Sequence, residues 1–361
     1  MVNDLRGKRV LLVEDDYFAA TELAAQLSAR GLSVVGPAAN VDNAFAHLHS
    51  EAQIEAGILD INLGGDVVFS VADELERRGL PFIFASGYEP RIVPARHADK
   101  ILLRKPLDEE AVAAALMRAL YVESIAPEDI NRNGLLSRLP QDVVDSLTPA
   151  LHKVYLPRGA LMEVQGQTVN RVYFPLECVA SLIAIGHDGT RIETGLIGRE
   201  GMTGFGIVEG DVQTPFELIN QIEGLSLAAS ADVFEKALAA HPMLRCLALR
   251  FARTVAIQVS YTALANGRSG IRQRLARWLL MVQDRIDQNP FNLTHDYLAV
   301  MLGVRRSSVT DALHLLEGER LIRSNRSRVE IINRKGLKNV AGEIYGPAEH
   351  EYERLMSLAT H

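Results

Sequence analysis

Acidic, hydroxyl and basic side chains recur in the first third of the chain where short apolar runs end. These residues are Glu14, Asp15, Asp60, Ser86 and Lys105. Three carboxylates that converge repel one another unless a cation lies among them, and such hard oxygen ligands suit Mg²⁺. An ammonium group and a hydroxyl are suited to holding phosphoryl oxygens. The set therefore predicts in-line attack by an aspartate carboxylate on a phosphoryl donor, with Mg²⁺ neutralising the developing charge.

A sheet that brings several strand ends together would position these groups. We predict five buried strands, at residues 9–14, 33–36, 57–60, 81–86 and 100–105. Helical patterns lie between them at 18–30, 41–50 and 67–78, and a last helix runs from 108 to about 121. This alternation predicts a parallel sheet covered on both faces, with its ligand site at the carboxyl ends of the strands.

Three motifs resemble those of response-regulator receiver domains: VEDD at 13–16, LDINLGG at 59–65 and LRKPL at 103–107. The resemblance implies a flavodoxin-like, doubly wound fold with Asp60 as the phosphoacceptor. It also implies that Ser86 is the switch hydroxyl and that Lys105 binds the phosphate. The implied Mg²⁺ ligands are Glu14, Asp15, Asp60 and the backbone carbonyl of Asn62.

Two features depart from the common receiver pattern. PFIFASGY at 81–88 resembles a subfamily in which the fourth helix is weak, and residues 88–97 contain two prolines. Leu102 stands where many receivers have an aromatic switch residue. Two interpretations of Tyr88 remain: it takes over that switching role, or it packs the loop.

The charge distribution separates the remaining chain into parts. The 361 residues carry a net charge of −7, which taken alone argues against nucleic-acid binding. Residues 266–345, however, carry +6, whereas residues 1–122 carry −6 and residues 123–265 carry −5. Such asymmetry indicates a nucleic-acid-binding segment within an acidic protein. The length predicts two to three domains, and the ordinary composition excludes a disordered, collagen-like or disulfide-scaffold chain.

No apolar run is long enough to span a bilayer, and acids stand where a signal peptide would have its apolar core. We therefore expect a cytoplasmic protein without membrane association. The isolated Cys178 and Cys246 are too few for a four-thiolate cluster or zinc site, and we expect them to be buried small hydrophobes.

The middle of the chain has a different sequence pattern from the strand–helix alternation of the first third. Residues 122–133 are polar and predicted to be a linker, and 134–150 form a short helical region. Short β-rich runs with glycine-containing turns between 154 and 227 predict an antiparallel barrel or roll. A helix from 242 to about 265 is apolar on most sides. One face would cover the roll and the other a second subunit, which gives a symmetric homodimer through 241–266.

This middle segment resembles the Crp–Fnr superfamily of transcription regulators, whose sensor is a cyclic-nucleotide-binding roll. Cyclic-nucleotide sensors of that superfamily hold the ligand phosphate with an arginine, but no arginine lies between Glu200 and Leu244. An anionic phosphate would lack its charge-assisted partner. We therefore expect no cyclic nucleotide as cofactor. Arg199 is the nearby candidate, either as a phosphate partner or as a turn residue.

The basic segment carries a helix-turn-helix pattern. After a helix at 270–286, Thr294 is a candidate N-cap, Gly303 marks a tight turn, and a second helix runs from about 305 to 319. Residues 321–332 predict a β-hairpin wing. The resemblance to the Crp–Fnr winged helix places Arg306, Ser307 and Asp311 at base-reading positions. The predicted DNA contacts are Arg305, Arg306, Ser307, Ser308, Thr310, Asp311, Arg323, Arg326 and Arg328.

The expected fold class is multidomain, α/β plus α+β. The expected parts are a receiver at 1–121, a linker at 122–133, a roll at 134–240, a dimerisation helix at 241–266, a winged helix-turn-helix domain at 267–340 and a tail at 341–361.

The sequence predicts a transcription factor that binds a palindromic, double-stranded promoter site and is controlled by phosphorylation of Asp60. Its expected partners are a histidine kinase or phosphotransfer protein and RNA polymerase; no dedicated enzyme activity is expected. Two alternatives remain: a receiver that acts as a phosphate sink with a minor DNA role, and a constitutive DNA binder with a vestigial receiver.

Overall fold

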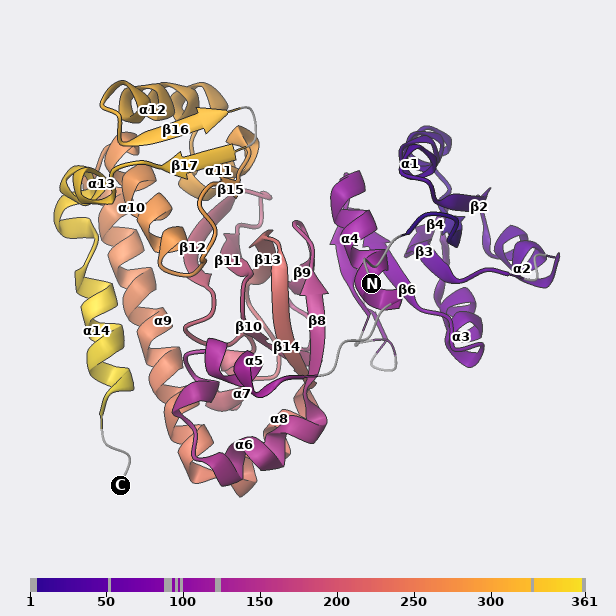
Figure 1. The fold of residues 1–361 in the computed structure, drawn as a ribbon, viewed down its shortest axis with the longest axis horizontal. Helices are drawn as coiled ribbons and strands as arrows, with labels where there is room; N and C mark the ends of the chain where they lie inside the picture. The colour runs from indigo at the N-terminus through magenta and orange to yellow at the C-terminus, as the bar shows by residue number, and fades with distance from the viewer. Residues whose placement is uncertain are drawn as a thin grey trace. The chain divides into compact units, whose positions relative to one another are not determined.

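The computed structural model describes residues 5–50, 53–87, 93–94, 97, 100–120, 125–325 and 328–358. The chain forms two compact units (Figure 1). The first comprises Met1–Ser124 with Lys153–Leu161, and the second comprises Ile125–His152 with Met162–His361. Among the residues described, no helix combines the length and the apolar character that crossing a bilayer requires.

A five-stranded parallel sheet with the order β2-β1-β3-β6-β7 forms the centre of the first unit. Its strands are β1 Arg9–Val13, β2 Ser33–Ala38, β3 Ala56–Asp60, β6 Phe82–Ser86 and β7 Leu102–Arg104. Its helices are α1 Tyr17–Ala29, α2 Val41–Ser50, α3 Phe69–Arg77 and α4 Glu109–Leu120. All five predicted strands are present, and so are the four predicted helices. Helix α1 packs with α4, and α2 packs with α3.

The start of α3 differs from the sequence expectation. Helix α3 begins at Phe69, although the apolar pattern predicted a start at residue 67. Residues 66–67 instead form β5 (Asp66–Val67), which pairs antiparallel with β4 (Asn62–Leu63). This small hairpin follows Asp60 directly, so the chain turns beside the end of β3 before α3 starts.

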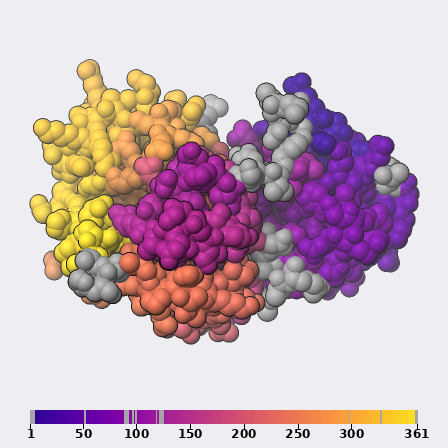
Figure 2. Space-filling view, turned by 60° about the horizontal axis from the view of Figure 1, so that its bottom comes forward, coloured from indigo at the N-terminus to yellow at the C-terminus, as the bar shows by residue number. Residues whose placement is uncertain are grey.

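The second unit begins with helices rather than with a free linker. Within the predicted linker, residues Pro127–Arg132 form α5, and η2 (Leu136–Arg138), α6 (Gln141–Leu147) and η3 (Thr148–Ala150) follow. Asn133 is fully buried, and its Nδ2 donates hydrogen bonds to the carbonyls of Pro175 at 3.0 Å and Gly201 at 2.8 Å. The linker expectation is therefore wrong for these residues, because a buried amide anchors them to the roll. Figure 2 shows this helical segment in magenta, exposed on the surface of the unit.

The predicted antiparallel roll is present. Its strands in the second unit are β9 Leu161–Glu163, β10 Arg171–Pro175, β11 Val179–Ile185, β12 Arg191–Ile197, β13 Glu217–Ile222 and β14 Gly224–Ser230. Strand β8 (His152–Leu156) belongs, apart from its first residue, to the segment Lys153–Leu161 of the first unit. One sheet has the order β12-β11-β13-β9, and β10 pairs antiparallel with β14. Helices α7 (Phe205–Glu209) and α8 (Ala231–Ala240) complete it.

A 27-residue helix, α9 (Pro242–Arg268), runs along the roll, and α10 (Ile271–Gln283) follows it (Figure 1). The C-terminal elements are β15 Phe291–Asn292, α11 His295–Leu302, α12 Arg306–Gly318, β16 Ile322–Asn325, β17 Arg328–Ile331, α13 Arg334–Ala341, η4 Gly342–Ile344 and α14 Pro347–Met356. The predicted tail is thus largely structured. Helix α14 packs along α9, so part of the α9 surface expected to face a second subunit is covered from within the chain.

Candidate functional sites

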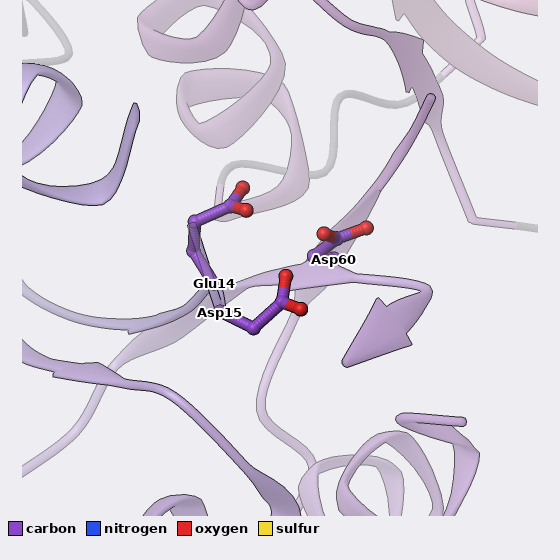
Figure 3. A group of neighbouring side chains, drawn as sticks. All are labelled: Glu14, Asp15 and Asp60. Carbon is purple, nitrogen blue, oxygen red and sulfur yellow. The ribbon is translucent and has the colours of Figure 1, made fainter. Parts of the chain in front are cut away.

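The structure brings together the three carboxylates expected at the strand ends of the first unit. Ligand oxygens of Glu14, Asp15 and Asp60 lie within 4.8 Å of one another (Figure 3). Glu14 and Asp60 are buried, whereas Asp15 is exposed. Parallel pairing explains the convergence, because Val13 in β1 pairs with Leu59 in β3, so that Glu14, directly after β1, lies beside Asp60 at the end of β3.

Lys105 reaches into this cluster. Its Nζ lies 2.6 Å from Oδ2 of Asp60 and 2.6 Å from Oε1 of Glu14. Burial alone would lower the pKa of Lys105, but the two carboxylates outweigh it and raise that pKa above its usual value. Burial raises the pKa of Glu14, and the ammonium group opposes this shift only in part.

The formal charges of the cluster favour the binding of a cation. Three ionised carboxylates and one ammonium group sum to −2, and two of the carboxylates are nearly out of contact with water. A divalent cation with oxygen ligands would balance that charge. The donor set therefore fits Mg²⁺, which Glu14, Asp15 and Asp60 would hold.

The other predicted residues of this site have different placements. Ser86 is buried and follows Ala85, the partner of Asp60 in the β3–β6 pairing. The backbone N–H of Asn62 donates a hydrogen bond to Oδ1 of Asp60 at 3.2 Å. Tyr88 lies outside the described residues.

A helix-turn-helix with a wing forms in the C-terminal part of the second unit. Thr294 caps α11 as predicted, since its Oγ1 accepts a hydrogen bond from the N–H of Tyr297 at 3.3 Å. Gly303 ends α11 with φ of 58°, a left-handed conformation that favours glycine. Helix α12 then begins at Arg306, and β16 and β17 pair antiparallel as the wing.

Most of the predicted DNA contacts lie at the exposed start of α12 and on the wing. The exposed side chains are those of Arg305, Arg306, Ser307, Asp311, Arg323 and Arg328. On the wing, Nη1 of Arg323 pairs with Oε2 of Glu330 at 2.9 Å, so part of its charge is already balanced within the protein. Ser308 is half-buried. Arg326 lies outside the described residues.

Thr310 has a role within the fold that sequence patterns do not reveal. Its Oγ1 lies 3.1 Å from Nδ1 of His295 and donates to the carbonyl of Arg306 at 3.2 Å. It therefore joins α11 to α12. Arg274 is a further positioning residue that the sequence did not single out, because its guanidinium donates to the carbonyl of Leu302 at the end of α11.

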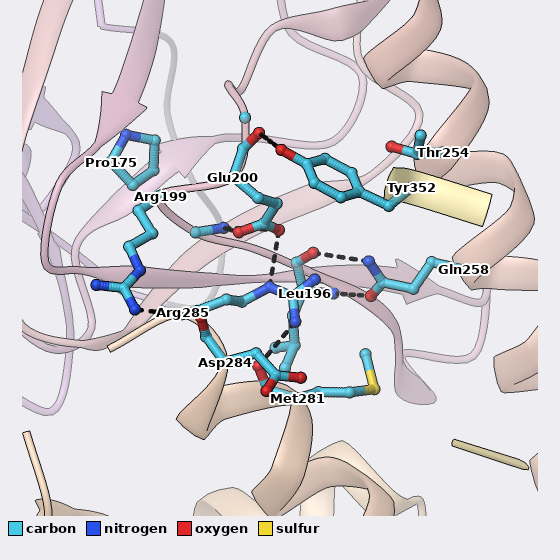
Figure 4. A network of polar contacts seen from close by, with 12 residues as sticks. Pro175, Leu196, Arg199, Glu200, Thr254, Gln258, Met281, Asp284, Arg285 and Tyr352 are labelled. Carbon is cyan, nitrogen blue, oxygen red and sulfur yellow. Dashed lines mark hydrogen bonds and ion pairs between the residues drawn. The ribbon is translucent and has the colours of Figure 1, made fainter. Parts of the chain in front are cut away.

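The roll uses Arg199 for an internal contact. Its Nη1 pairs with Oδ1 of Asp287, and its Nη2 lies 3.4 Å from the carbonyl oxygen of Asp284 (Figure 4). Both partners follow α10. The guanidinium therefore ties the turn after β12 to the segment after α10.

Comparison with known proteins identifies one part of the chain. Residues 273–340 match the model of the Crp-like helix-turn-helix domain. The chain therefore contains a Crp-like helix-turn-helix domain in the segment where the structure has the helix-turn-helix and its wing. No curated protein matches the chain.

Solved structures resemble part of the chain at low identity. FixK2 from Bradyrhizobium japonicum has a TM-score of 0.47 and 16% identity, over 53% of this chain and 98% of its own. A transcriptional regulator of the CRP family from Thermus thermophilus has a TM-score of 0.43 and 21% identity, over 52% of this chain and 96% of its own.

Proposed function

We propose that the chain is a two-component response regulator, in which phosphorylation of Asp60 controls DNA binding by the Crp-like domain. The main observation behind this proposal is the contact of Lys105 Nζ with Asp60 and Glu14, beside Asp15. The strand order β2-β1-β3-β6-β7 supports a flavodoxin-like receiver, whose ligand site lies at the carboxyl ends of its strands.

The chemistry is phosphoryl transfer to a carboxylate. An oxygen of Asp60 attacks phosphorus in line, and its new bond forms as the bond from phosphorus to the donor's leaving atom breaks; that atom is an imidazole nitrogen in a phosphohistidine donor and an oxygen in acetyl phosphate. Mg²⁺, when bound, neutralises charge on the carboxylates and phosphoryl oxygens. Lys105 pairs with a phosphoryl oxygen in place of a carboxylate, and the Ser86 hydroxyl donates to another. A histidine kinase or phosphotransfer protein would supply the phosphoryl group.

Phosphorylation with acetyl phosphate and Mg²⁺ tests the acceptor, followed by phosphate-affinity electrophoresis and mass spectrometry. We expect one modified site in the wild type and none in Asp60→Asn. Asp66→Asn is the matched control, because Asp66 is an exposed carboxylate in the hairpin that follows Asp60. Modification of Asp60→Asn to the wild-type extent would contradict the assignment.

Operator binding with and without beryllofluoride tests the coupling between the receiver and DNA. A palindromic site selected from random sequence would serve as the double-stranded probe, and we expect its affinity to change when beryllofluoride is added. Equal affinity would indicate a constitutive binder with a vestigial receiver. Rapid phosphotransfer without any selected site would indicate a phosphate sink. We expect the protein to contact RNA polymerase once it is bound at a promoter.

The proposed regulator is a homodimer through α9. Between the faces that pack on the roll and on α14, this helix exposes Leu249, Arg253, Ala256, Ser260, Ala263 and Gly267. Their spacing alternates between four and three residues, as in the seam of a coiled coil, and the small side chains allow close approach of a second α9. A second copy of the chain would cover this stripe.

We propose that the roll does not bind cyclic nucleotide in the usual way. Arg199 is engaged with Asp287, and the sequence offers no arginine between Glu200 and Leu244. A phosphate buried there would therefore lack a charge-assisted partner. Calorimetric titration with cyclic AMP and cyclic GMP should show no micromolar binding, and micromolar binding of either would refute this.

A further inference from the structure

The segment Lys153–Leu161 belongs to the first unit, although the chain before and after it belongs to the second. It meets β7, the strand at one edge of the parallel sheet. Ala160 pairs antiparallel with Leu103, and the N–H of Arg104 donates a hydrogen bond to the carbonyl of Gly159 at 3.2 Å. Residues from a distant part of the chain therefore extend the sheet at this edge.

The turn in this segment, Pro157–Ala160, makes a second contact through Arg158. Gly159 in the turn has a φ of 84°, a left-handed conformation that favours glycine. The guanidinium of Arg158 forms an ion pair with Oδ2 of Asp108. The side chain of Arg158 is only 17% exposed, so water and salt screen this pair less than a pair on the open surface.

Asp108 also caps helix α4. Its Oδ1 accepts hydrogen bonds from the N–H groups of Glu110 at 2.9 Å and Ala111 at 3.2 Å. Burial alone would raise the pKa of Asp108, but these N–H groups and the guanidinium of Arg158 outweigh burial and lower that pKa. Asp108 is therefore an anion at neutral pH, and its ion pair joins the start of α4 to the turn.

The two contacts flank Lys105 along the chain. Arg104 precedes it directly, and Asp108 follows three residues later. Between them, Nζ of Lys105 lies 2.6 Å from an oxygen of Asp60 and 2.6 Å from an oxygen of Glu14. The stretch that carries this ammonium group is thus held by the turn on both sides while the ammonium group contacts the acidic cluster.

Phosphorylation of Asp60 would change what this ammonium group contacts. Phosphoryl oxygens lie farther from the backbone of β3 than the carboxylate oxygens that Lys105 contacts in this structure. Pairing with them therefore requires the ammonium group to withdraw. Because Arg104 and Asp108 flank Lys105 within one short stretch, and hydrogen bonds weaken as their geometry departs from the optimum, this displacement weakens the contacts with the turn.

We propose that the turn Pro157–Ala160 is an inhibitory contact, which holds Lys105 in its unphosphorylated arrangement and is released when Asp60 is phosphorylated. Arg158 is its positioning residue. The inference rests on the function proposed above. Coupling of this kind is reciprocal, so a contact that phosphorylation weakens also opposes phosphorylation by the same factor. Because the chain continues from this segment into the second unit in both directions, release of the turn gives the receiver a covalent route to the rest of the protein.

Beryllofluoride affinity tests the contact on the full-length protein with Mg²⁺, with the bound ligand followed by its ¹⁹F resonances. Arg158→Ala should bind beryllofluoride about fivefold more tightly than the wild type, or tighter still. Arg158→Lys keeps a cation opposite Asp108 and should restore the wild-type affinity.

Asp108→Asn provides an independent variant, because its amide oxygen can still cap α4 while the charge is removed. It should bind beryllofluoride as tightly as Arg158→Ala, and the double variant should gain nothing beyond either single change. Arg77→Ala is the matched control, since Arg77 is an exposed arginine whose partner, Glu74, lies on the same helix. This control should keep the wild-type affinity.

Hydrogen exchange gives a second measurement on the wild type. The amide of Arg104 should exchange faster when beryllofluoride is bound, because it loses the carbonyl of Gly159 as acceptor. Equal or weaker beryllofluoride binding by Arg158→Ala, or unchanged exchange at Arg104, would overturn the inhibitory contact and leave the proposed function intact. A wild type that binds no beryllofluoride would refute the proposed function, and the inhibitory contact with it.

Discussion

Glu193 is a carboxyl group in the interior of the second unit. One oxygen accepts a hydrogen bond from Nε1 of Trp278 at 2.7 Å, and the other accepts one from the hydroxyl of Ser181. These bonds join β12 to β11 and to α10. Burial raises the pKa of Glu193 to about 8, against partial opposition from the two hydrogen bonds. The folded protein therefore holds a proton here at neutral pH.

This proton makes the stability of the fold depend on pH. The unfolded chain releases the proton near its ordinary pKa of 4.5, whereas the folded chain keeps it until about pH 8. Between these two pH values the folded state binds more protons than the unfolded state. The contribution of Glu193 to the free energy of unfolding is therefore greatest below pH 4.5 and falls as the pH rises to 8. Glu193→Gln, whose amide can both accept from Trp278 and donate to Ser181, should unfold in urea with a flatter pH dependence between about 5 and 8.

Exposed Glu235 provides the control for this measurement. Glu235→Gln removes the same charge from the surface and should retain the wild-type slope of stability against pH. If Glu193→Gln also retained that slope, another buried group would be responsible.

Arg306 is exposed at the start of α12, where an arginine can reach base edges in the major groove. Arg306→Ala should weaken binding to a specific operator by about 1–3 kcal/mol and relax its sequence preference. Competition gel shifts with the selected operator and with scrambled DNA measure both effects. Arg77→Ala, a change at an exposed arginine of the first unit, should leave both unchanged. Equal losses on specific and scrambled DNA would indicate a phosphate contact instead.

At the scale of elements, the second unit depends on a close approach between the turn after β12 and the long helix α9. A Cβ atom at Gly201 would lie 1.9 Å from Cε2 of Phe251, a ring that is 1% exposed. The carbonyl of Gly201 also accepts the hydrogen bond from Asn133. The same turn includes Arg199 and Glu200, which contact the segment after α10. A glycine here therefore lets the roll, α9 and the first helices of the unit meet.

Gly201→Ala should destabilise the second unit by about 1–3 kcal/mol or more, because the buried ring has to move. Thermal unfolding followed by circular dichroism measures this loss. Gly210→Ala is not a suitable control, because its φ of 91° adds backbone strain, whereas Gly318→Ala adds a Cβ to open space at the exposed end of α12. A melting temperature for Gly201→Ala equal to that of Gly318→Ala would contradict the packing argument.

At the scale of the whole molecule, the C-terminal segment changes the expected role of α9. The apolar pattern of this helix predicted one face for the roll and one for a partner. The structure instead divides its surface among the roll, α14 and an exposed stripe. The stripe is rich in small residues, so the area that remains for a second subunit is a narrow seam.

Ala256→Glu places a charge in the middle of this seam, facing its own copy across the two-fold axis. We expect the variant to be a monomer by light scattering at concentrations where the wild type is a dimer, and to lose affinity for a palindromic operator. Ala239→Glu adds the same charge to an exposed position of α8 and should stay dimeric. A dimeric Ala256→Glu would show that α9 is not the interface.

The sequence alone predicted the elements whose periodicity is local. The five strands of the first unit are short apolar runs, and Thr294 and Gly303 mark the turn of the helix-turn-helix by their own conformational preferences. The convergence of Glu14, Asp15 and Asp60 followed from one topological rule, since parallel strands bring their carboxyl ends to one edge. The expected roles of these residues in phosphorylation stay predictions.

Only the tertiary structure decided the contacts that join distant segments. Local composition predicted a linker at residues 122–133 and a tail at 341–361. In the structure, however, buried Asn133 anchors the first of these segments to the roll, and helix α14 of the second packs on α9. The proton on Glu193 likewise arises from neighbours far away in the chain. The physical reason is that periodicity and turn chemistry act within a few residues, whereas burial and pairing depend on which remote surfaces meet.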